Sequence, residues 1–196
     1  MPSSGDSFDA ERLRRKLAAR QRLQVALDGF APAAVLVPLV TEAGKPDRLL
    51  FTERRHDLST HAGQIAFPGG KRDAGDTDSA ATAVRETSEE LGVAPAEVEL
   101  LGLLDDVPTP TRFVITPVVA RLRGPLTLTP SPGEVASIFY TEIAELADPR
   151  RYLANGSRTF MGITYDMHEY RWEPHRIWGA TARMVHQLLA LLAEDA

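Results

Sequence analysis

Glu86, Glu89 and Glu90 stand close together in a stretch that is predicted to be helical. At about 3.6 residues per turn, the carboxylates of Glu86 and Glu90 project near one another, and that of Glu89 lies beside them. Like charges at this spacing destabilise a helix by roughly a few tenths of a kcal/mol, so a neutralising cation is expected. Hard carboxylate oxygens at this density suit Mg²⁺ or Mn²⁺. The alternative is an acidic helix face in solvent, which is the commoner role of such a run.

The residues around these glutamates predict a helix from Ser79 to Leu91. Asp76 and Asp78 offer side-chain caps at its start, and Gly92 can adopt the left-handed conformation that ends a helix. Residues at helical spacing predict a buried stripe, which would place the glutamates at 86 and 90 about 110° around the helix from the core. The predicted stripe consists of Ala80, Val84, Thr87 and Leu91.

Gly69 and Gly70 precede this helix. Because glycine has no Cβ, the backbone there can turn tightly and come close to a metal ion or a phosphate. Two adjacent glycines alone would predict only a turn. With the glutamates behind them, we expect metal and phosphate contacts, with the Gly69 carbonyl as a metal ligand and Gly70 against the substrate.

Residues 69–93 resemble the Nudix box, whose pattern is G-x5-E-x7-R-E-U-x-E-E-x-G-U with U apolar. Its second half matches residues 85–93, R-E-T-S-E-E-L-G-V, with Thr87 at an aliphatic position. In the first half the pattern expects Gly where Lys71 stands and Glu where Thr77 stands. The loop is therefore one residue longer than in the general pattern.

The longer loop is similar to that of one Nudix branch, the coenzyme A pyrophosphatases. Residues 50–70 resemble the signature of that branch, L-L-T-x-R-S-x3-L-x2-H-x-G-Q-x2-F-P-G-G, and the branch also has an Asp at the position of Asp76. Arg55 replaces the usual small residue, and Ser59 stands where a basic residue is common. Both departures bear on how the nucleotide end of a substrate is held. The resemblance covers residues 33–184.

The resemblance implies a Mg²⁺- or Mn²⁺-dependent hydrolase that cuts the pyrophosphate of coenzyme A or its thioesters into 3',5'-ADP and 4'-phosphopantetheine. It also implies a Nudix-type α/β/α sandwich with a mixed central sheet, in agreement with the predicted order of strands and helices. The glutamate helix handles only the pyrophosphate, so NADH, ADP-ribose and ADP-sugars remain alternative substrates. A nucleotide-binding regulator without catalysis is a further alternative, which the complete set of glutamates disfavours.

Glu86 and Glu90 are the expected primary metal ligands, with Glu89 as a further ligand or as the catalytic base. Glu134, within P-G-E-V, matches a glutamate of the coenzyme A branch and is the leading candidate outside the helix for water activation or a further metal contact, with Glu89 as the competing base. An exposed loop acid is the competing interpretation of Glu134. We expect Arg85 to brace the glycine loop through an acid such as that at position 76 rather than to touch the substrate.

Substrate contacts are expected around the glycine loop from Arg54, His61, Gln64, Gly70 and Lys71. Exposed surface charges are the alternative for Arg54 and Lys71, and loop packing through hydrogen bonds is the alternative for His61 and Gln64. Phe113 and Trp178 could stack on adenine, but core packing is the favoured interpretation. The other histidines lack metal-ligand spacing and are interpreted as structural. They are His56, His168, His175 and His186.

The 196 residues suit one domain with an appended element: residues 1–30 as a tail and a helix packed on the domain, and residues 31–196 as the Nudix domain. The appended helix is predicted at 8–27, with Leu13, Leu17 and Ala18 inward. Segments 126–129 and 135–140 are predicted to pair as strands, and segments 159–165 and 168–172 to form a hairpin that turns at Asp166.

The net charge of −5 argues against a protein that binds the nucleic-acid backbone, and a small-molecule substrate is the expected partner. The absence of cysteine excludes a disulfide framework and a thiol nucleophile. No apolar run is long enough to span a bilayer, and no export signal is visible, so we expect a cytoplasmic protein without a membrane partner. Nudix relatives are frequently dimers, so a homodimer stays open.

Overall fold

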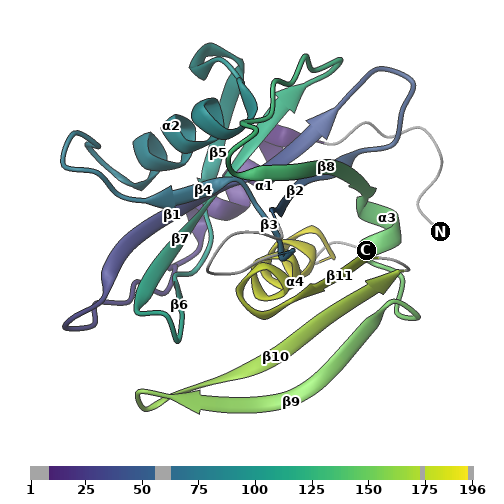
Figure 1. Ribbon diagram of the computed structural model, residues 1–196. Coiled ribbons are helices and arrows are strands. Elements are labelled where there is room, and N and C mark those ends of the chain that lie inside the picture. The colour runs from purple at the N-terminus through teal and green to yellow at the C-terminus, as the bar shows by residue number, and fades with distance from the viewer. Residues whose placement is uncertain (1–8, 56–62, 173–174, 194–196) are drawn as a thin grey trace.

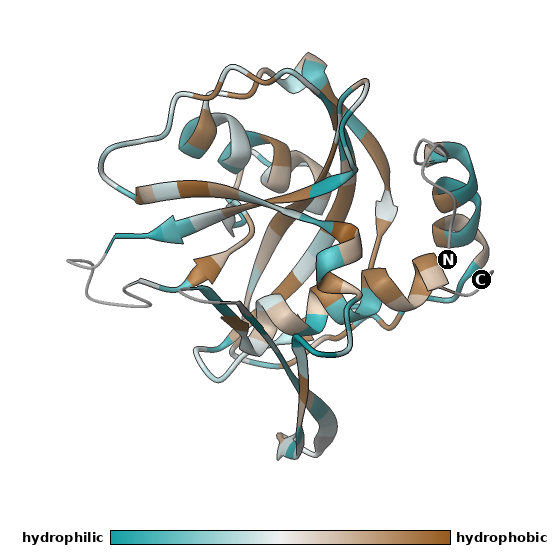
Figure 2. Cartoon of the chain, turned by 90° about the vertical axis from the view of Figure 1, so that its right-hand side faces the viewer, coloured by the Kyte–Doolittle hydropathy of each residue, from teal (hydrophilic) through white to brown (hydrophobic). Residues whose placement is uncertain are grey.

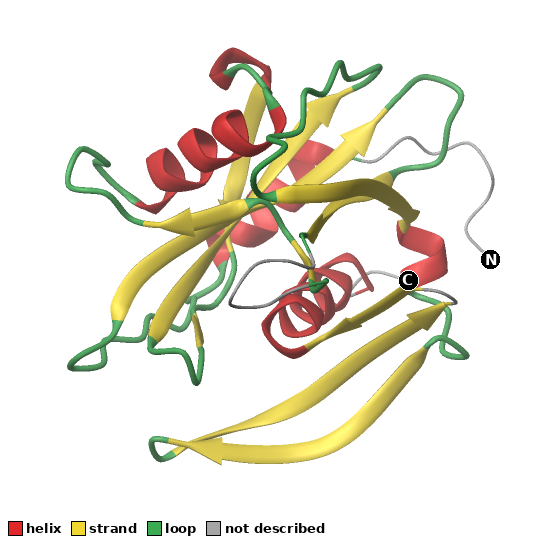
Figure 3. Ribbon diagram, viewed as in Figure 1, coloured by secondary structure: helices red, strands yellow, loops and turns green. Residues whose placement is uncertain are grey.

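A mixed β-sheet with helices on both faces forms the body of the protein (Figures 1 and 3). The computed structural model describes residues 9–55, 63–172 and 175–193. The predicted α/β/α sandwich with a mixed central sheet is confirmed.

The central pair of strands, β1 (Ala31–Thr41) and β7 (Phe113–Arg123), runs parallel and stays in register over its whole length. β2 (Arg48–Arg54) pairs antiparallel with β1. The remaining strands of this sheet are β3 (Ile65–Ala66), β4 (Gly69–Lys71), β5 (Val98–Leu103), β6 (Val107–Pro108) and β8 (Val135–Glu142). β4 pairs with the first half of β1, which fixes the glycine loop on the sheet.

Both faces of β1 are apolar, as expected for a strand covered on each side. Val37 and Leu39 join the core cluster beneath α1 (Ala10–Ala19) and α4 (Gly179–Ala193). Ala34 and Leu36 join the cluster beneath α2 (Ser79–Leu91), on the opposite face. This alternation with a period of about two residues builds the three layers.

α2 has the predicted bounds. Asp78 caps its start by accepting a hydrogen bond from the Ala81 amide, and Gly92 ends it at a φ of +73°. The predicted buried stripe was partly wrong, since Ala80 and Val84 are only half-buried. The residues of α2 that are buried are Thr82, Ala83, Thr87, Glu90 and Leu91. The helix is turned so that the small side chain of Ala83 meets the sheet, which carries a glutamate at position 90 inward.

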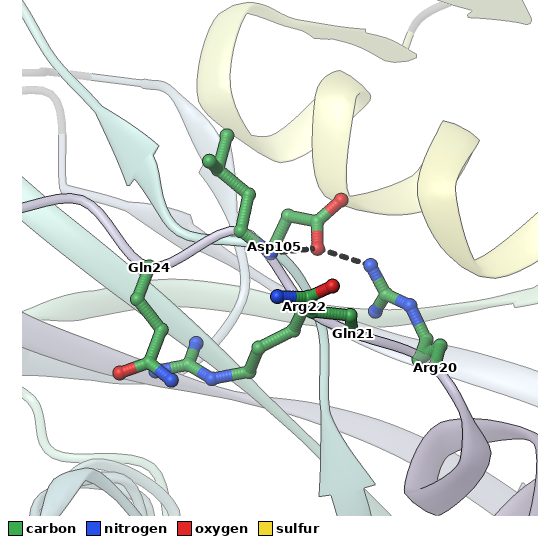
Figure 4. A pocket seen from close by; sticks show the side chains of 6 residues that line it. Arg20, Gln21, Arg22, Gln24 and Asp105 are labelled. Carbon is green, nitrogen blue, oxygen red and sulfur yellow. Dashed lines mark hydrogen bonds and ion pairs between the residues drawn. The ribbon is translucent and has the colours of Figure 1, made fainter.

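The first helix was predicted too long, because α1 ends at Ala19 and the chain continues extended. Backbone amides of the extended segment bind two neighbouring acids far along the sequence and not the carbonyls of a helix. Asp105 accepts from the Leu23 amide at 2.8 Å, and Asp106 accepts from the Val25 amide at 2.9 Å. Figure 4 shows Asp105 bound to this segment and to the Arg20 guanidinium. Leu13 and Leu17 are buried, as predicted, whereas Ala18 is exposed.

A second, antiparallel sheet consists of β9 (Tyr152–Phe160), β10 (Ile163–Trp172) and β11 (His175–Trp178). Figure 2 shows the β9–β10 hairpin extending away from the body of the molecule. The predicted hairpin was shifted: the turn lies at Met161 and Gly162, and Asp166 pairs with Ser157 within the strands. Positive φ angles at both turn residues explain the shift.

Two short helical turns complete the described chain, η1 (Pro95–Glu97) and α3 (Ile143–Leu146). The predicted pairing of segments 126–129 and 135–140 was wrong. Residues 126–129 form no strand, and β8 pairs with β2 instead. The amide of Thr129 donates to the Leu91 carbonyl, so the end of α2 takes up this segment.

A stacked pair of imidazoles joins the hairpin to α4. The rings of His168 and His186 lie 3.9 Å apart at an angle of 13°. Tyr152 hydroxyl lies 3.0 Å from His168 Nδ1, and Tyr170 hydroxyl lies 3.3 Å from His186 Nδ1. The structural role predicted for these two histidines is confirmed. Burial, with a smaller contribution from the charge of His186, lowers the pKa of His168 to about 4.

We expect acid to destabilise the fold through this pair. The pKa of a histidine in the unfolded chain is about 6.5, so the unfolded state binds more protons than the folded state as pH falls from about 6.5 to 4. The stability that neutral His168 contributes is fully present above its pKa in the unfolded chain and is lost as the pH falls below that value. The free energy of unfolding is measured in urea at a series of pH values. Between pH 4 and 6.5 it should depend less on pH in His168→Phe than in the wild type, whereas above pH 7 the two proteins should show the same dependence. Equal slopes in the acid range would contradict the assignment.

Candidate active site

The turn at Gly69 and Gly70 fits closely against its surroundings, against backbone at Gly69 and against a side chain at Gly70. A Cβ on Gly69, whose φ is +155°, would lie 2.4 Å from the carbonyl oxygen of Ala34 on β1. A Cβ on Gly70 would lie 2.5 Å from the carboxyl atoms of Glu86. The loop backbone therefore lies directly against the glutamates of α2, and the predicted contacts of the glycines with metal and phosphate stay a prediction.

Glu90 is enclosed beside this turn, with 4 % of its surface exposed. Its Oε2 accepts a hydrogen bond from the Gly69 amide at 3.3 Å. Burial raises the pKa of Glu90 to about 7, against the effect of that amide. The negative charges of Glu134 and Glu86 raise the pKa as well, and the positive charge of Arg54 lowers it. The sequence prediction had placed this carboxylate away from the core, but it lies on the buried side of α2.

Glu86 is the half-buried partner of Glu90. Burial raises the pKa of Glu86, and Arg85 opposes the rise through a hydrogen bond. The charges of Glu89 and Glu134 add to the rise. Glu134 therefore acts on both carboxyl groups of the pair, from a segment far away in the sequence.

Backbone hydrogen bonds bring Glu134 to this place. The Ser131 amide donates to the Glu90 carbonyl at 2.8 Å, which seats the loop on the end of α2. The carbonyl of Glu134 itself accepts from the Arg55 amide at 3.2 Å. Arg55 also donates from Nη1 to the Pro132 carbonyl at 2.7 Å. The arginine that departs from the signature thus holds the loop that carries Glu134.

Arg85 braces the glycine loop through Asp76, as predicted. Its Nε and Nη2 donate to the two Asp76 oxygens at 3.0 and 2.9 Å, and Nη2 also donates to the Lys71 carbonyl at 3.1 Å. The Arg85 guanidinium holds the pKa of Asp76 well below its usual range. Asp76 further accepts from the Thr82 hydroxyl at 3.0 Å. This bidentate pair fixes the loop relative to α2.

Glu89 lies on the outer side of α2. Its side chain is 59 % exposed, and it accepts from Arg85 Nη1 at 3.1 Å. The same nitrogen lies 3.0 Å from Glu86 Oε1. Within the parts of the chain that the structure describes, no three Asp, Glu or His side chains converge as a ready metal site. Glu86 and Glu90 are the pair that faces the glycines.

A cavity of about 560 Å³ opens beside the glycine loop. Arg54, Gln64, Gly69, Gly70 and Lys71 line it, so most of the predicted substrate contacts are brought to one place. His61 lies outside the described residues, as does Ser59.

Two aromatic residues expected in the core instead line this cavity. Phe113 is half-buried, and Trp178 is 44 % exposed, because it lies at the end of β11 where the wall of the cavity begins. The core-packing interpretation of both was wrong. A second, more open hollow along residues 20–24 contains none of the predicted site residues (Figure 4).

The far wall of the cavity was missed by sequence reasoning. It comes from β9, β10 and α4 and includes Arg158, Tyr165, Met167 and Arg183. The arginines and the tyrosine could be read from the sequence. Because the predicted hairpin register was shifted, it did not show which of them lie on the same face of the sheet.

Residues 30–161 match the NUDIX domain. The chain belongs to the Nudix hydrolase family. It is 39% identical over 200 residues to the mitochondrial coenzyme A diphosphatase NUDT8 of Homo sapiens. This alignment covers 96% of this chain and 81% of that protein. NUDT8 of Mus musculus is 36% identical over 204 residues, with 98% of this chain and 92% of that protein covered. The uncharacterized Nudix hydrolase NudL of Photorhabdus laumondii is 39% identical over 162 residues, or 82% and 84% of the two chains.

Solved Nudix structures share the fold. A MutT/nudix family protein from Enterococcus faecalis superposes with a TM-score of 0.54 over 95% of this chain and 75% of that chain, at 12% identity. The Nudix hydrolase RenU from M. smegmatis superposes with a TM-score of 0.51 over 60% and 74%, at 24% identity. Among the described residues of this Nudix hydrolase, no helix has the length and apolar character needed to cross a membrane.

Nudix hydrolases generally use divalent metal ions, and the residues around the glycine turn fit such an ion. Glu86 and Glu90 are acidic groups whose pKa values are raised by burial and by other carboxylates. A cation beside them would favour the charged carboxylates and lower both pKa values. Gly70 leaves open the space next to Glu86 that a Cβ would fill. Carboxylate oxygens with a backbone carbonyl are the donors that hard cations prefer.

Gly70→Ala should therefore damage this Nudix site selectively. The new Cβ would push the Glu86 carboxylate aside, and a displacement of about 1 Å at a catalytic group can lower turnover by roughly 100-fold. Gly75→Ala is the matched control, because a Cβ there meets nothing within 4 Å. Hydrolysis of nucleoside diphosphate derivatives and thermal melting should be measured for both. Equal activity of the two variants would show that the close approach is not needed.

Proposed function

We propose that this Nudix hydrolase cleaves the pyrophosphate bond of coenzyme A and its thioesters, releasing 3',5'-ADP and 4'-phosphopantetheine or its acyl form. The similarity to the coenzyme A diphosphatase NUDT8 over nearly the whole chain carries this proposal. The arrangement of the site supports it: residues of the signature on β2 and β3 line the same cavity as the glycine loop.

In this mechanism, Glu86 and Glu90 would hold Mg²⁺ or Mn²⁺ together with the Gly69 carbonyl, and Glu89 would add a carboxylate from the outer side. When bound, the ions neutralise pyrophosphate oxygens and lower the pKa of the attacking water. The water adds to one phosphorus, the bond from that phosphorus to the bridging oxygen breaks, and two phosphomonoesters result.

Either Glu89 or Glu134 could be the base that takes the proton from water. Glu89 is engaged by Arg85 and points outward. Glu134 acts electrostatically on the Glu86 and Glu90 carboxyls. We therefore assign proton transfer to Glu134 and keep Glu89 as an auxiliary ligand.

Arg54 is the proposed contact for the pyrophosphate oxygens. Its Nε is buried and has no hydrogen-bond partner among the described residues. An unsatisfied buried donor is costly, so an anionic acceptor from the substrate would stabilise it. Lys71 is exposed at the same cavity and adds a second positive charge, and Gln64 and Gly70 complete the near wall. His61 stays a predicted contact.

The cellular setting of the enzyme is a separate prediction. A cytoplasmic location is proposed from the sequence, although two similar proteins are named as mitochondrial. A homodimer and the division of the chain at residues 30 and 31 also stay predictions.

A panel of coenzyme A, acetyl-coenzyme A, NADH and ADP-ribose, each with Mg²⁺ and with Mn²⁺, tests the substrate, with products identified by chromatography. Coenzyme A or its thioester should be cut fastest. A clear preference for ADP-ribose or NADH would overturn the proposal, and binding without any product would indicate a regulator instead.

Glu90→Gln in the same panel tests the role of the buried carboxylate. The amide keeps the shape of the side chain but cannot carry the charge, so turnover should fall by roughly 100-fold or more, since even the loss of a group that supports a metal ligand costs about 10- to 100-fold. The fold should persist by circular dichroism. Near-normal turnover in the folded variant would refute the assignment of Glu90.

A further inference from the structure

The charged residues that line the cavity are strongly unbalanced. They comprise four cations and one acid: Arg54, Lys71, Arg158, Arg183 and Asp166. Arg54 and Lys71 come from β2 and β4, next to the glycine turn, whereas Arg158 and Arg183 come from β9 and α4 on the opposite wall. The pyrophosphate of the proposed substrate needs only the first pair. The second pair has no role in the chemistry described above.

Arg183 is held in place without a carboxylate. Its guanidinium carbon lies 5.1 Å from the centre of the Tyr165 ring, a cation–π distance. The Nη1 atom is buried and has no hydrogen-bond partner among the residues that the structure describes. Burial lowers the pKa of Arg183, although a guanidinium keeps its charge at neutral pH. An anion bound at this wall of the cavity would accept a hydrogen bond from the unpaired donor and offset the positive charge of the half-buried guanidinium.

Arg158 stands next to the same tyrosine. It is the direct cross-strand partner of Tyr165, and opposite residues of an antiparallel pair share one face of the sheet. Arg158 is exposed, so its guanidinium can move toward a ligand. Arg158 of the hairpin and Arg183 of α4 are therefore both neighbours of Tyr165 at this wall of the cavity.

The acids whose charges act on Arg183 are already engaged elsewhere. Asp166 accepts from the Ser157 hydroxyl at 2.6 Å. Asp105 accepts from the Leu23 amide and from the Arg20 guanidinium. Neither carboxylate takes a hydrogen bond from Arg183 among the described residues, so Nη1 is available to a ligand.

We propose that Arg183 and Arg158 form a subsite for a phosphomonoester, the 3'-phosphate on the ribose of the substrate. Two guanidinium groups can bind a phosphate dianion through paired N–H donors. Trp178, exposed in the same cavity just before α4, lies where an adenine attached to that ribose could stack. The inference rests on the proposed function, because NADH and ADP-ribose lack this phosphate.

Two nucleotides that differ by one phosphate test the subsite without turnover. Binding of 3',5'-ADP and of 5'-AMP to metal-free protein is measured by calorimetry. The wild type should bind 3',5'-ADP about 10- to 100-fold more tightly, which is the range that hydrogen bonds to a charged group provide. Arg183→Gln should remove most of this preference and leave the affinity for 5'-AMP unchanged.

Arg150→Gln is the matched control, because it removes the same charge from a side chain that is 87% exposed and lies outside the cavity. Its preference for 3',5'-ADP should equal that of the wild type. Arg158→Gln is the second test variant, since an exposed hairpin residue can change without loss of the fold. It should lower the preference several-fold. If Arg183→Gln does not fold, Arg158→Gln decides the question.

An unchanged preference in the folded variants would overturn the subsite, as would an equal loss for both nucleotides. Failure of the subsite can be told from failure of the proposed function. Cleavage of coenzyme A by a wild type that does not distinguish the two nucleotides removes the subsite alone. A preference that depends on Arg183, in a protein that does not cleave coenzyme A, supports the subsite and removes the proposed function.

Discussion

The contact between a glycine turn and two enclosed glutamates is the constraint on which the site depends. β1 fixes the turn from one side through its pairing with β4, and the Arg85–Asp76 pair fixes it from the helix side. Between them, Glu86 and Glu90 are held close to the backbone of the loop, and the nearby Arg85 and Arg54 only partly offset the effect of burial on their charges. Such an arrangement costs stability in the isolated protein and becomes favourable when a cation binds.

The parts of the fold that could be predicted are those with local causes. The bounds of α2 follow from a capping aspartate and a left-handed glycine, and the central strands follow from their apolar character. The extended segment after Ala19 could not be predicted, because its amides bind Asp105 and Asp106, which lie far along the chain. The hairpin register failed for a related reason, since Met161 adopts a positive φ that is rare for its residue type.

The candidate site divides in the same way. Its centre was visible because glycines and glutamates at fixed spacing form a local pattern. The sequence did not predict that Glu90 faces inward, because the rotation of α2 about its axis depends on how Ala83 packs on the sheet. Glu134 was found only through family resemblance, and its position depends on hydrogen bonds to the end of α2. The wall around Tyr165 needed the three-dimensional arrangement of the hairpin and α4.

Binding of Mn²⁺ to the protein without substrate tests the central claim most directly, by electron paramagnetic resonance or calorimetry. The wild type should bind the ion, and Glu86→Gln and Glu90→Gln should each weaken binding about 10-fold or more, since each removes a charged ligand. Asp73→Asn, which neutralises an exposed acid of the neighbouring loop, should bind as the wild type does. Undiminished Mn²⁺ affinity in both glutamine variants would contradict a metal site at these two carboxylates.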